Sequence, residues 1–316
     1  MREVMRPLAR KLFQALLLVV GVTLISFLLM VWFGPDQTYT LIGKNATTEQ
    51  IAEVRHQLGY DDPFLLRYGE YLLELVTLDL GVSNASGESV RTLLARTVPI
   101  SLVLMIPGFV LGNGVGIALG LASAHRRGRR SDRLITALSV TGMSISFLVV
   151  LIAFQVLFST PYGLDLFPVR GWRVSGWTSY LHYVTVPTLA LLFVTFGYNT
   201  RFYRALFIEE IGRDHIRAAR ALGASESVIL WKHVLKNSMV PIITRIMFSI
   251  PLVVISGSLL IESYFGIPGI GQATFEAITS GDQPVLKAVV GLTAVAFVAI
   301  QFLTELLCRR LDPRLG

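Results

Sequence analysis

The chain has 316 residues, of which 53% are hydrophobic and only 16% are charged, and its mean hydropathy is +0.61. A soluble protein of this length is much less apolar, so the composition indicates a membrane protein. The net charge of +7 is compatible with a nucleic-acid partner, but the basic residues form short clusters beside apolar runs, as membrane topology requires, and we expect no nucleic acid. The single cysteine, Cys308, excludes an internal disulfide and a multi-cysteine metal site.

The first segment, residues 1–33, joins a basic start to a long apolar run. Residues 12–33 are apolar over 22 positions, which exceeds the apolar core of a signal peptide, and no small-residue cleavage site follows them. Four basic residues precede the run: Arg2, Arg6, Arg10 and Lys11. We therefore expect a retained first membrane span with its amino end in the cytoplasm.

Residues 34–99 are more polar and mostly acidic, which predicts an external segment. Thr48 and the acidic residue after it open a capped helix to about residue 58, where Gly59 ends it. Pro63 suits the start of a second helix, which carries Tyr68 and Tyr71. We expect this stretch to be an external helical loop.

The second predicted span, residues 100–124, carries Gly112, Gly116 and Gly120 four positions apart on one face. Small residues at that spacing let two helices approach closely, so this span is expected to pack inside the helix bundle. Asn113 lies beside that face. A polar residue within a span is a functional candidate, although a hydrogen bond to a neighbouring helix would also explain it.

The next predicted elements alternate between basic and apolar. Residues 125–133 hold five arginines in nine positions and are therefore assigned to the cytoplasm. Residues 134–158 form the third predicted span. An external loop with several tryptophans follows, and the fourth span runs from about residue 183 to 200, leading into a polar, basic stretch at residues 201–241.

That basic stretch reads as two short helices joined by a turn. From Arg213 to Leu222 the small or apolar residues Ile216, Ala219 and Leu222 recur at helical spacing, while arginines line a different face. Gly223 can adopt the left-handed conformation that ends helices. Ser225 can cap a second helix, which places Glu226 in its first turn and continues through Val228, Trp231 and Leu235. Such a pair between membrane spans is typical of a docking element.

The fifth predicted span, residues 240–261, contains Pro251 and Gly257, and proline within a span favours a bend. A bent helix suits a gate. A short external helix is predicted at residues 275–279, the sixth span at 285–307 and a basic tail at 308–316. Five residues are therefore candidates for a gate or a transport pathway: Asn113, Arg245, Pro251, Gly257 and Glu262.

The distribution of basic residues supports this topology. Nineteen Lys and Arg residues fall in the segments assigned to the cytoplasm and seven in the external segments. The excess predicts that both termini are cytoplasmic, although the first external loop is long enough to carry little weight in this rule.

Several motifs together resemble a known family. RAA at residues 217–219, Gly223 and HVL at 233–235 follow the pattern of a cytoplasmic loop motif in the permease subunits of ATP-binding-cassette importers; Arg217 replaces its glutamate and Lys236 its proline. GSLLIESYF at 257–265, PGIG at 268–271 and DPR at 312–314 resemble signatures of the dipeptide, oligopeptide and nickel branch. LGYDDP at 58–63 and LDLGVS at 78–83 resemble the type with a long external loop after the first span.

The resemblance implies an all-α, six-span permease of the bacterial cytoplasmic membrane that forms half of a pathway for dipeptides or oligopeptides. It implies four partners: a second homologous permease, two ATPases that bind ATP and Mg, and an external solute-binding protein. Coupling helices at residues 206–238 would dock to the ATPases through Arg213, His215, Arg217, Ala218, Ala219, Arg220 and Gly223. Nickel, opines, peptide antibiotics and sugars stay open as cargo, and the external loop either caps the protein or contacts the binding protein.

The sequence lacks the strings of several enzyme classes. It has no G-x-x-x-x-G-K-[ST] phosphate loop, no H-E-x-x-H and no G-x-S-x-G, so we expect neither catalysis, nor a cofactor, nor a metal in this chain. An ion-driven secondary transporter would predict paired carboxylates or inverted repeats, and no repeat is found. A non-transporting membrane scaffold would use the same helix pair to bind any helical partner, and only a coupling assay separates it from a permease.

Overall fold

The computed structural model describes residues 2–34, 38, 42, 47–57 and 59–311. Within these residues the chain is helical, and β pairing is limited to one isolated antiparallel bridge between Val82 and Ser89. The predicted all-α class is therefore confirmed. The chain divides into two compact units, one made of Met1–Ile100 with Pro268–Gln301 and the other of Ser101–Ile267 with Phe302–Gly316.

Four of the described helices are long and apolar enough to cross a membrane. They are Phe13–Phe33 within α1 (Arg2–Phe33), α5 (Val90–His125), α8 (Trp177–Ile211) and α14 (Gln283–Leu311). The pair α6 (Arg130–Ser144) and α7 (Phe147–Ser159) makes a fifth if it is counted as one span. The predicted fifth span is divided among α11 (Met239–Leu252), the π-helix η2 (Val253–Gly257) and α12 (Ser258–Phe265).

The third predicted span differs from the expectation of one straight helix. α6 and α7 meet at an angle of 100°, because Ile145 and Ser146 between them have extended backbone with ψ of 132° and 136°. Serine side chains compete with the backbone for hydrogen bonds, and the Ser144 hydroxyl donates to Val140 O in the last turn of α6. An apolar run of the right length does not reveal such a break.

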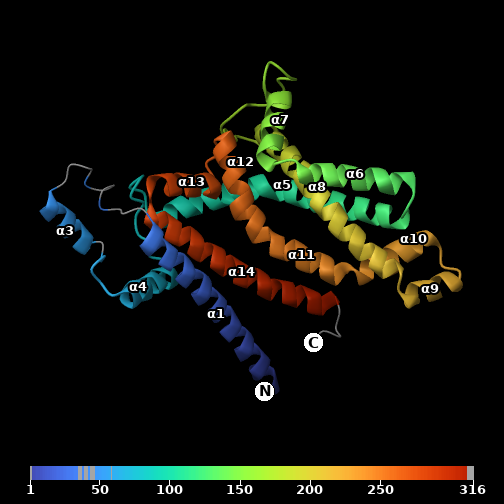
Figure 1. The fold of residues 1–316 in the computed structure, drawn as a ribbon, viewed down its shortest axis with the longest axis horizontal. Helices are drawn as coiled ribbons and strands as arrows, with labels where there is room; N and C mark the ends of the chain where they lie inside the picture. The colour runs from blue at the N-terminus through green and yellow to red at the C-terminus, as the bar shows by residue number, and fades with distance from the viewer. Residues whose placement is uncertain (1, 35–37, 39–41, 43–46, 58, 312–316) are drawn as a thin grey trace. The chain divides into compact units, whose positions relative to one another are not determined.

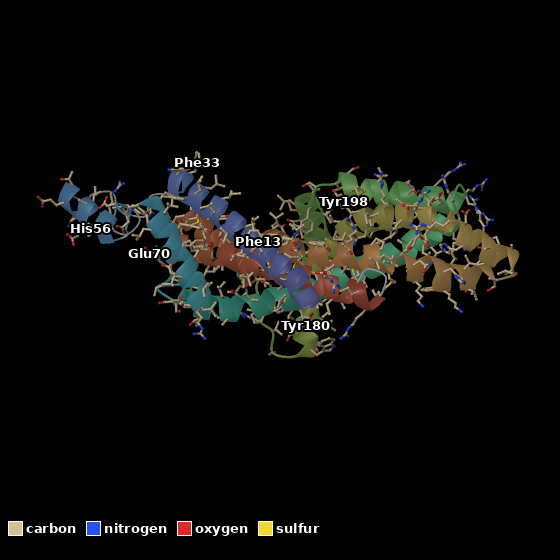
Figure 2. The ribbon with its side chains drawn as sticks, turned by 90° about the horizontal axis from the view of Figure 1, so that it is seen from below. Phe13, Phe33, His56, Glu70, Tyr180 and Tyr198 are labelled. Carbon is tan, nitrogen blue, oxygen red and sulfur yellow. The ribbon has the colours of Figure 1, made fainter. Side chains whose placement is uncertain are left out.

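In the first unit, helix α4 (Phe64–Thr77) packs against α1. Phe27 of α1 is buried with Tyr68 and Tyr71 of α4, and the rings of Phe27 and Tyr71 stack with centroids 5.5 Å apart. The Tyr71 hydroxyl also donates to Lys287 O of α14 at 3.0 Å. Helix α3 (Thr48–Gln57) precedes α4, so both predicted external helices are present. Phe33, the last residue of α1, is 80% exposed (Figure 2).

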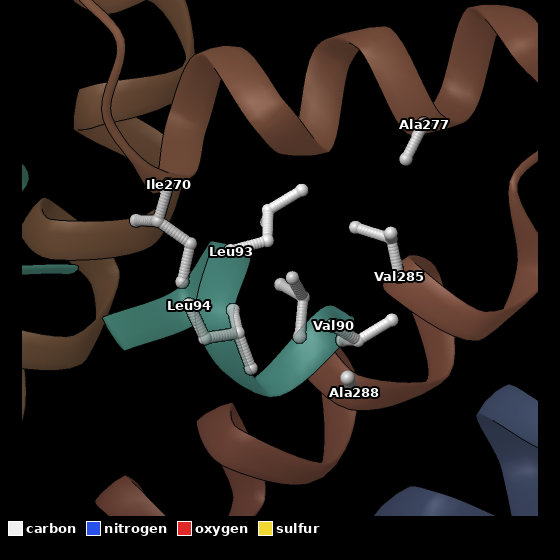
Figure 3. Packing of buried hydrophobic residues seen from close by; sticks show 8 residues of the cluster. Val90, Leu93, Leu94, Ile270, Ala277, Val285 and Ala288 are labelled. Atoms are coloured by element: carbon white, nitrogen blue, oxygen red, sulfur yellow. The ribbon is translucent and has the colours of Figure 1, made fainter. Parts of the chain in front are cut away.

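A second cluster of the same unit joins the start of α5 to α13 (Ile270–Ser280) and α14. Its buried residues are Val90, Leu93, Leu94, Ile270, Ala277, Val285, Ala288 and Val289 (Figure 3). Helix α13 is longer than the short helix predicted at residues 275–279. It begins directly after Gly269, which has extended backbone, and ends at Gly281, whose φ of +73° is the left-handed conformation that stops helices.

The second unit is built on close contact between α5 and α8 (Figure 1). Between residues 108 and 120, every fourth residue of α5 is a glycine that faces α8; the pairs are Gly108 with Leu191, Gly112 with Thr195, Gly116 with Asn199 and Gly120 with Tyr203. A Cβ atom on Gly116 would lie 2.5 Å from Asn199 Cβ, and one on Gly120 would lie 2.9 Å from Tyr203 Cβ. The close helix approach predicted from the glycine spacing is therefore confirmed.

This contact generates a stability prediction. We expect Gly116→Ala to destabilise the protein by about 1–3 kcal/mol, because the added methyl group must push the α8 backbone away. Gly114→Ala is the matched control, since no atom lies within 4 Å of a Cβ at Gly114 of the same helix. Thermal unfolding of the purified protein in detergent measures both. Equal unfolding temperatures for the two variants would contradict the tight α5–α8 contact.

Candidate docking site and pathway residues

Residues 206–238, which we call the docking segment, contain the last turn of α8, α9 (Asp214–Ala221), α10 (Glu226–Val228) and the π-helix η1 (Ile229–Leu235). Gly223 follows α9 with a φ of +84°. The amide of Ala224 donates to Ala219 O and that of Gly223 to Arg220 O, the hydrogen-bond pattern of a glycine-terminated helix. The predicted stop at Gly223 is confirmed.

The second helix begins as predicted and then widens. The Ser225 hydroxyl accepts a hydrogen bond from Val228 N at 3.4 Å and so caps α10. From Ile229 the chain follows a π-helix, whose hydrogen bonds link residues five apart. Ile229 and Val234, five apart, are both fully buried, whereas Trp231 is 64% exposed. The helical stretch thus runs through Val228, Trp231 and Leu235 as predicted, and its π-helical part determines that Ile229 and Val234 face inward.

The docking segment is anchored to the membrane helices by an apolar core. The cluster contains Ile216, Ile229 and Val234 of the docking segment with Tyr203 and Phe207 of α8, Leu121 and Ala124 of α5, and Ile242 of α11. Ile216 is fully buried, as its place on the apolar face of α9 predicted. Leu222, expected on the same face, is 88% exposed because α9 ends at Ala221 and Leu222 already belongs to the turn.

Ionic contacts hold the two short helices together. The Arg220 guanidinium donates to both carboxylate oxygens of Glu226, at 2.8 and 3.3 Å. This hydrogen bonding lowers the pKa of the Glu226 carboxyl below its ordinary value. Glu226 also lies 3.8 Å from His125 Nδ1 at the end of α5. The turn between the helices is therefore closed by a charged pair on its exposed side.

A second charged group fixes the start of α9. Glu210 of α8 is buried, and its carboxylate lies 3.0 Å from Arg213 Nε and 3.2 Å from His215 Nε2. His215 Nε2 in turn lies 3.0 Å from Asn237 Nδ2, which follows η1. These contacts connect α8, α9 and the entry to α11. The predicted docking residues keep exposed surface except Ala219, which is half-buried.

A buried ion pair that the sequence did not reveal lies beside the docking segment. Asp132 of α6 is 4% exposed and accepts hydrogen bonds from Arg204 Nε and Nη2 at 2.8 and 2.9 Å, from Ser123 Oγ and from Gly128 N. The pair ties α8 to the arginine-rich loop at residues 125–133. The only sequence signal is one acidic residue among five arginines, and it does not name the partner.

Asn113 belongs to a polar network between α5, α8 and α11. Its Oδ1 accepts hydrogen bonds from Tyr203 Oη at 2.8 Å and from Asn199 Nδ2 at 3.3 Å, and its own Nδ2 donates to Phe109 O. Arg245 Nη2 donates to Asn199 Oδ1 at 3.4 Å. The structure thus joins two pathway candidates, Asn113 and Arg245, through Asn199, a residue that sequence analysis did not select.

Arg245 lies on the wall of a groove along α11. Its guanidinium carbon stands 4.2 Å from the centroid of the Phe202 ring. The groove has a volume of about 620 Å³ and is lined by Phe202, Val240, Pro241, Thr244, Arg245, Phe248, Ser249 and Leu252, a size common for small-molecule sites.

The other three pathway candidates lie further along the same span. Pro251 is buried in the last turn of α11, and the π-helix η2 ends at Gly257. Glu262 is fully buried in α12. At the end of α12, Arg170 donates to Tyr264 O at 3.1 Å and to Ser263 O at 3.3 Å, so a cation meets the helix C-terminus.

Within the described residues no group of three or more His, Cys, Asp or Glu side chains could hold a metal ion.

Comparison with known families gives two matches that cover most of the chain. Residues 116–316 match the family described as binding-protein-dependent transport system inner membrane component. Residues 4–105 match the N-terminal family of the membrane components of the same transport systems.

Individual relatives and one solved structure agree with these matches. The dipeptide transport system permease protein DppB of Lactococcus lactis subsp. cremoris is 33% identical over 294 residues, covering 93% of each chain. The glutathione transport system permease protein GsiC of Salmonella typhimurium is 31% identical and covers 92% of each. The fold resembles a chain in an inward-facing structure of the MetNI methionine ABC transporter, with a TM-score of 0.57, 20% identity and coverage of 70% of this chain and 96% of that one.

The anchoring of the docking segment can be tested with one pair of variants. Ile216→Ala should destabilise the protein by about 2–4 kcal/mol and speed tryptic cleavage after the arginines of α9, because it leaves a cavity beneath that helix. Leu222→Ala should change stability by less than about 0.5 kcal/mol, since that side chain is exposed. Thermal unfolding and timed proteolysis in detergent give both values. A larger effect at Leu222 than at Ile216 would refute this anchoring.

Proposed function

The chain belongs to the family of binding-protein-dependent transport system inner membrane components, and on that premise we propose that it is the permease subunit of an ATP-driven importer of dipeptides or oligopeptides. It is a multi-pass protein of the inner membrane and a transport component, not an enzyme. The observation that carries the peptide assignment is the 33% identity to a dipeptide permease over 93% of both chains.

The proposal includes four partners. A second homologous permease completes the pathway, and an external binding protein delivers the cargo. Two ATPases, which themselves bind ATP and Mg, dock at the docking segment. In support, the predicted docking residues Arg213, His215, Arg217, Ala218, Arg220 and Gly223 are exposed. The opposite face of the docking segment packs against the membrane helices α5, α8 and α11. A partner bound to the exposed face is therefore mechanically coupled to these helices.

The proposed topology has six spans and both termini in the cytoplasm. The spans are α1, α5, the bent pair α6–α7, α8, the stretch α11–η2–α12, and α14. Residues 34–99 are the external loop, 100–307 the five remaining spans with the docking segment, and 308–316 the cytoplasmic tail, of which residues 312–316 lie outside the described part. In support, the Asp132–Arg204 pair and the His125–Glu226 contact bring the two most basic segments together on one side.

The proposed mechanism is alternating access. ATP binding closes the ATPase pair and moves the docking segment, hydrolysis resets it, and the pathway opens to each side in turn. Movement of α9 reaches α8 through Ile216 and Phe207, and reaches α11 through Ile242 of the same cluster. A packed core transmits such a displacement because it is nearly incompressible.

Purification from the native membrane tests the assembly. We expect the chain to bring down a permease of similar size and one or two ATPases, whose ATP hydrolysis rises when a peptide-loaded binding protein is added. The same complex in proteoliposomes should take up peptide only with ATP inside. Recovery of the chain alone, with uptake driven by a proton or sodium gradient, would replace the importer with a secondary transporter.

Coupling at Gly223 gives a sharper test. Gly223→Val forces a β-branched residue into a φ of +84°, which strains the turn. We expect ATP-driven uptake to fall at least tenfold, while the unfolding temperature falls no further than that of a control variant with the same backbone strain. Gly128→Val is the matched control, since Gly128 has a φ of +82°, open space around it and a place in the other cytoplasmic loop. Uptake and ATPase rates are measured side by side. Full uptake by the Gly223 variant would remove that residue from the docking site.

A further inference from the structure

The groove along α11 holds a positive charge inside a predicted membrane span. Arg245 lies six positions after the first residue of α11, about 9 Å along the helix axis. A charged side chain at such depth is unfavourable unless it faces a cavity or a partner, and this one lines the groove. An anion bound in the groove would therefore lower the free-energy cost of burying this charge.

The protein fixes the direction of the guanidinium without neutralising it. The Phe202 ring covers one face of the group at 4.2 Å, and Asn199 accepts one hydrogen bond from Nη2. Neither group is an anion, and among the described residues no carboxylate forms an ion pair with Arg245. A guanidinium has five N–H donors in a planar fork, so donors remain for a ligand, and they suit a carboxylate, which can accept two parallel hydrogen bonds.

The hydroxyl groups of the groove have complementary chemistry. Thr244 Oγ1 donates its proton to Val240 O at 2.9 Å, and Ser249 Oγ donates to Ile246 O at 2.8 Å. The Cys308 thiol, 3.6 Å from Thr244 Oγ1, then donates to one of the two lone pairs of that oxygen and leaves the other for a ligand. Both oxygens can therefore offer only lone pairs to a ligand, which suits a backbone N–H group. The rest of the lining is apolar, with Phe202, Val240, Phe248 and Leu252.

We propose that this groove binds the carboxyl end of the peptide cargo, with the terminal carboxylate on Arg245 and a peptide N–H facing the hydroxyl of Thr244 or Ser249. The proposal rests on the peptide importer proposed above and adds a binding group to it. Every peptide carries a terminal carboxylate and nearly every one carries backbone N–H groups, so recognition of these groups fixes the polarity of the cargo but leaves its sequence free. The apolar lining then accommodates different side chains.

Uptake of an acid and its amide tests the proposal. Proteoliposomes with the complete transporter receive Ala-Phe or Ala-Phe-amide together with the same binding protein. The acid-to-amide ratio of uptake rates is compared between variants, so that the binding protein's own preference cancels. We expect Arg245→Gln to lower this ratio about tenfold, through loss of the charged hydrogen bonds, and Arg245→Lys to give an intermediate value.

Arg201→Gln is the matched control, because Arg201 lies exposed on α8 next to Phe202, and it should leave the ratio unchanged. An unchanged ratio for Arg245→Gln would overturn the proposal. If the ratio stayed unchanged because both uptake rates fell by the same factor, the guanidinium would belong to the fold or pair with an acidic residue of the second permease. Absence of ATP-dependent uptake by the unaltered transporter would instead refute the proposed function, so the two failures are distinct.

Discussion

The close contact between α5 and α8 is the constraint on which the second unit depends. Glycines on α5 let the α8 backbone approach until a single added methyl group would collide with it. The α8 residues at these positions also make the contacts that organise this unit: Asn199 and Tyr203 belong to the polar network, and Phe207, one turn further, packs against the docking segment. One face of one helix therefore positions both the groove and the docking site.

The polar side chains named above within the bundle are hydrogen-bonded to one another. Asn199 and Tyr203 donate hydrogen bonds to Asn113. Asp132 accepts hydrogen bonds from two nitrogens of Arg204, from a serine hydroxyl and from a backbone amide. A buried carboxylate requires such complete coordination, since an unpaired one would be strongly unfavourable. Arg245 differs from these groups because only neutral atoms hold it. Its contrast with Arg204, an arginine with a full carboxylate partner, is the reason for proposing the groove as a binding site.

Features fixed by a few adjacent residues could be predicted from the sequence. The stop at Gly223, the cap at Ser225 and the glycine spacing of α5 need only local geometry, and each is present. Features that depend on a distant partner could not. Asn199 is one polar residue in a long helix until Asn113 faces it. The 100° break after α6 lies at the end of a short stretch rich in small and polar residues, 141–146, whose composition alone does not give the angle. The π-helix η1 changes which residues face inward, and helical periodicity in the sequence did not indicate this wider turn.

The fifth predicted span is held at both ends and weakest in its middle. α11 is fixed by Ile242 in the docking core and by Arg245 against α8, while α12 is fixed by Arg170 at its C-terminal carbonyls and by Gly171 N, which donates to Phe265 O. Between them lie Pro251, which lacks an amide proton, and the wide turns of η2. Helices bend at such sites because fewer regular hydrogen bonds must change. A displacement that enters through the docking segment thus reaches the groove intact and meets its first flexible point at residues 253–257, beyond the groove. The groove and the docking segment would then move as one body, and the part of the span that carries Glu262 would move separately.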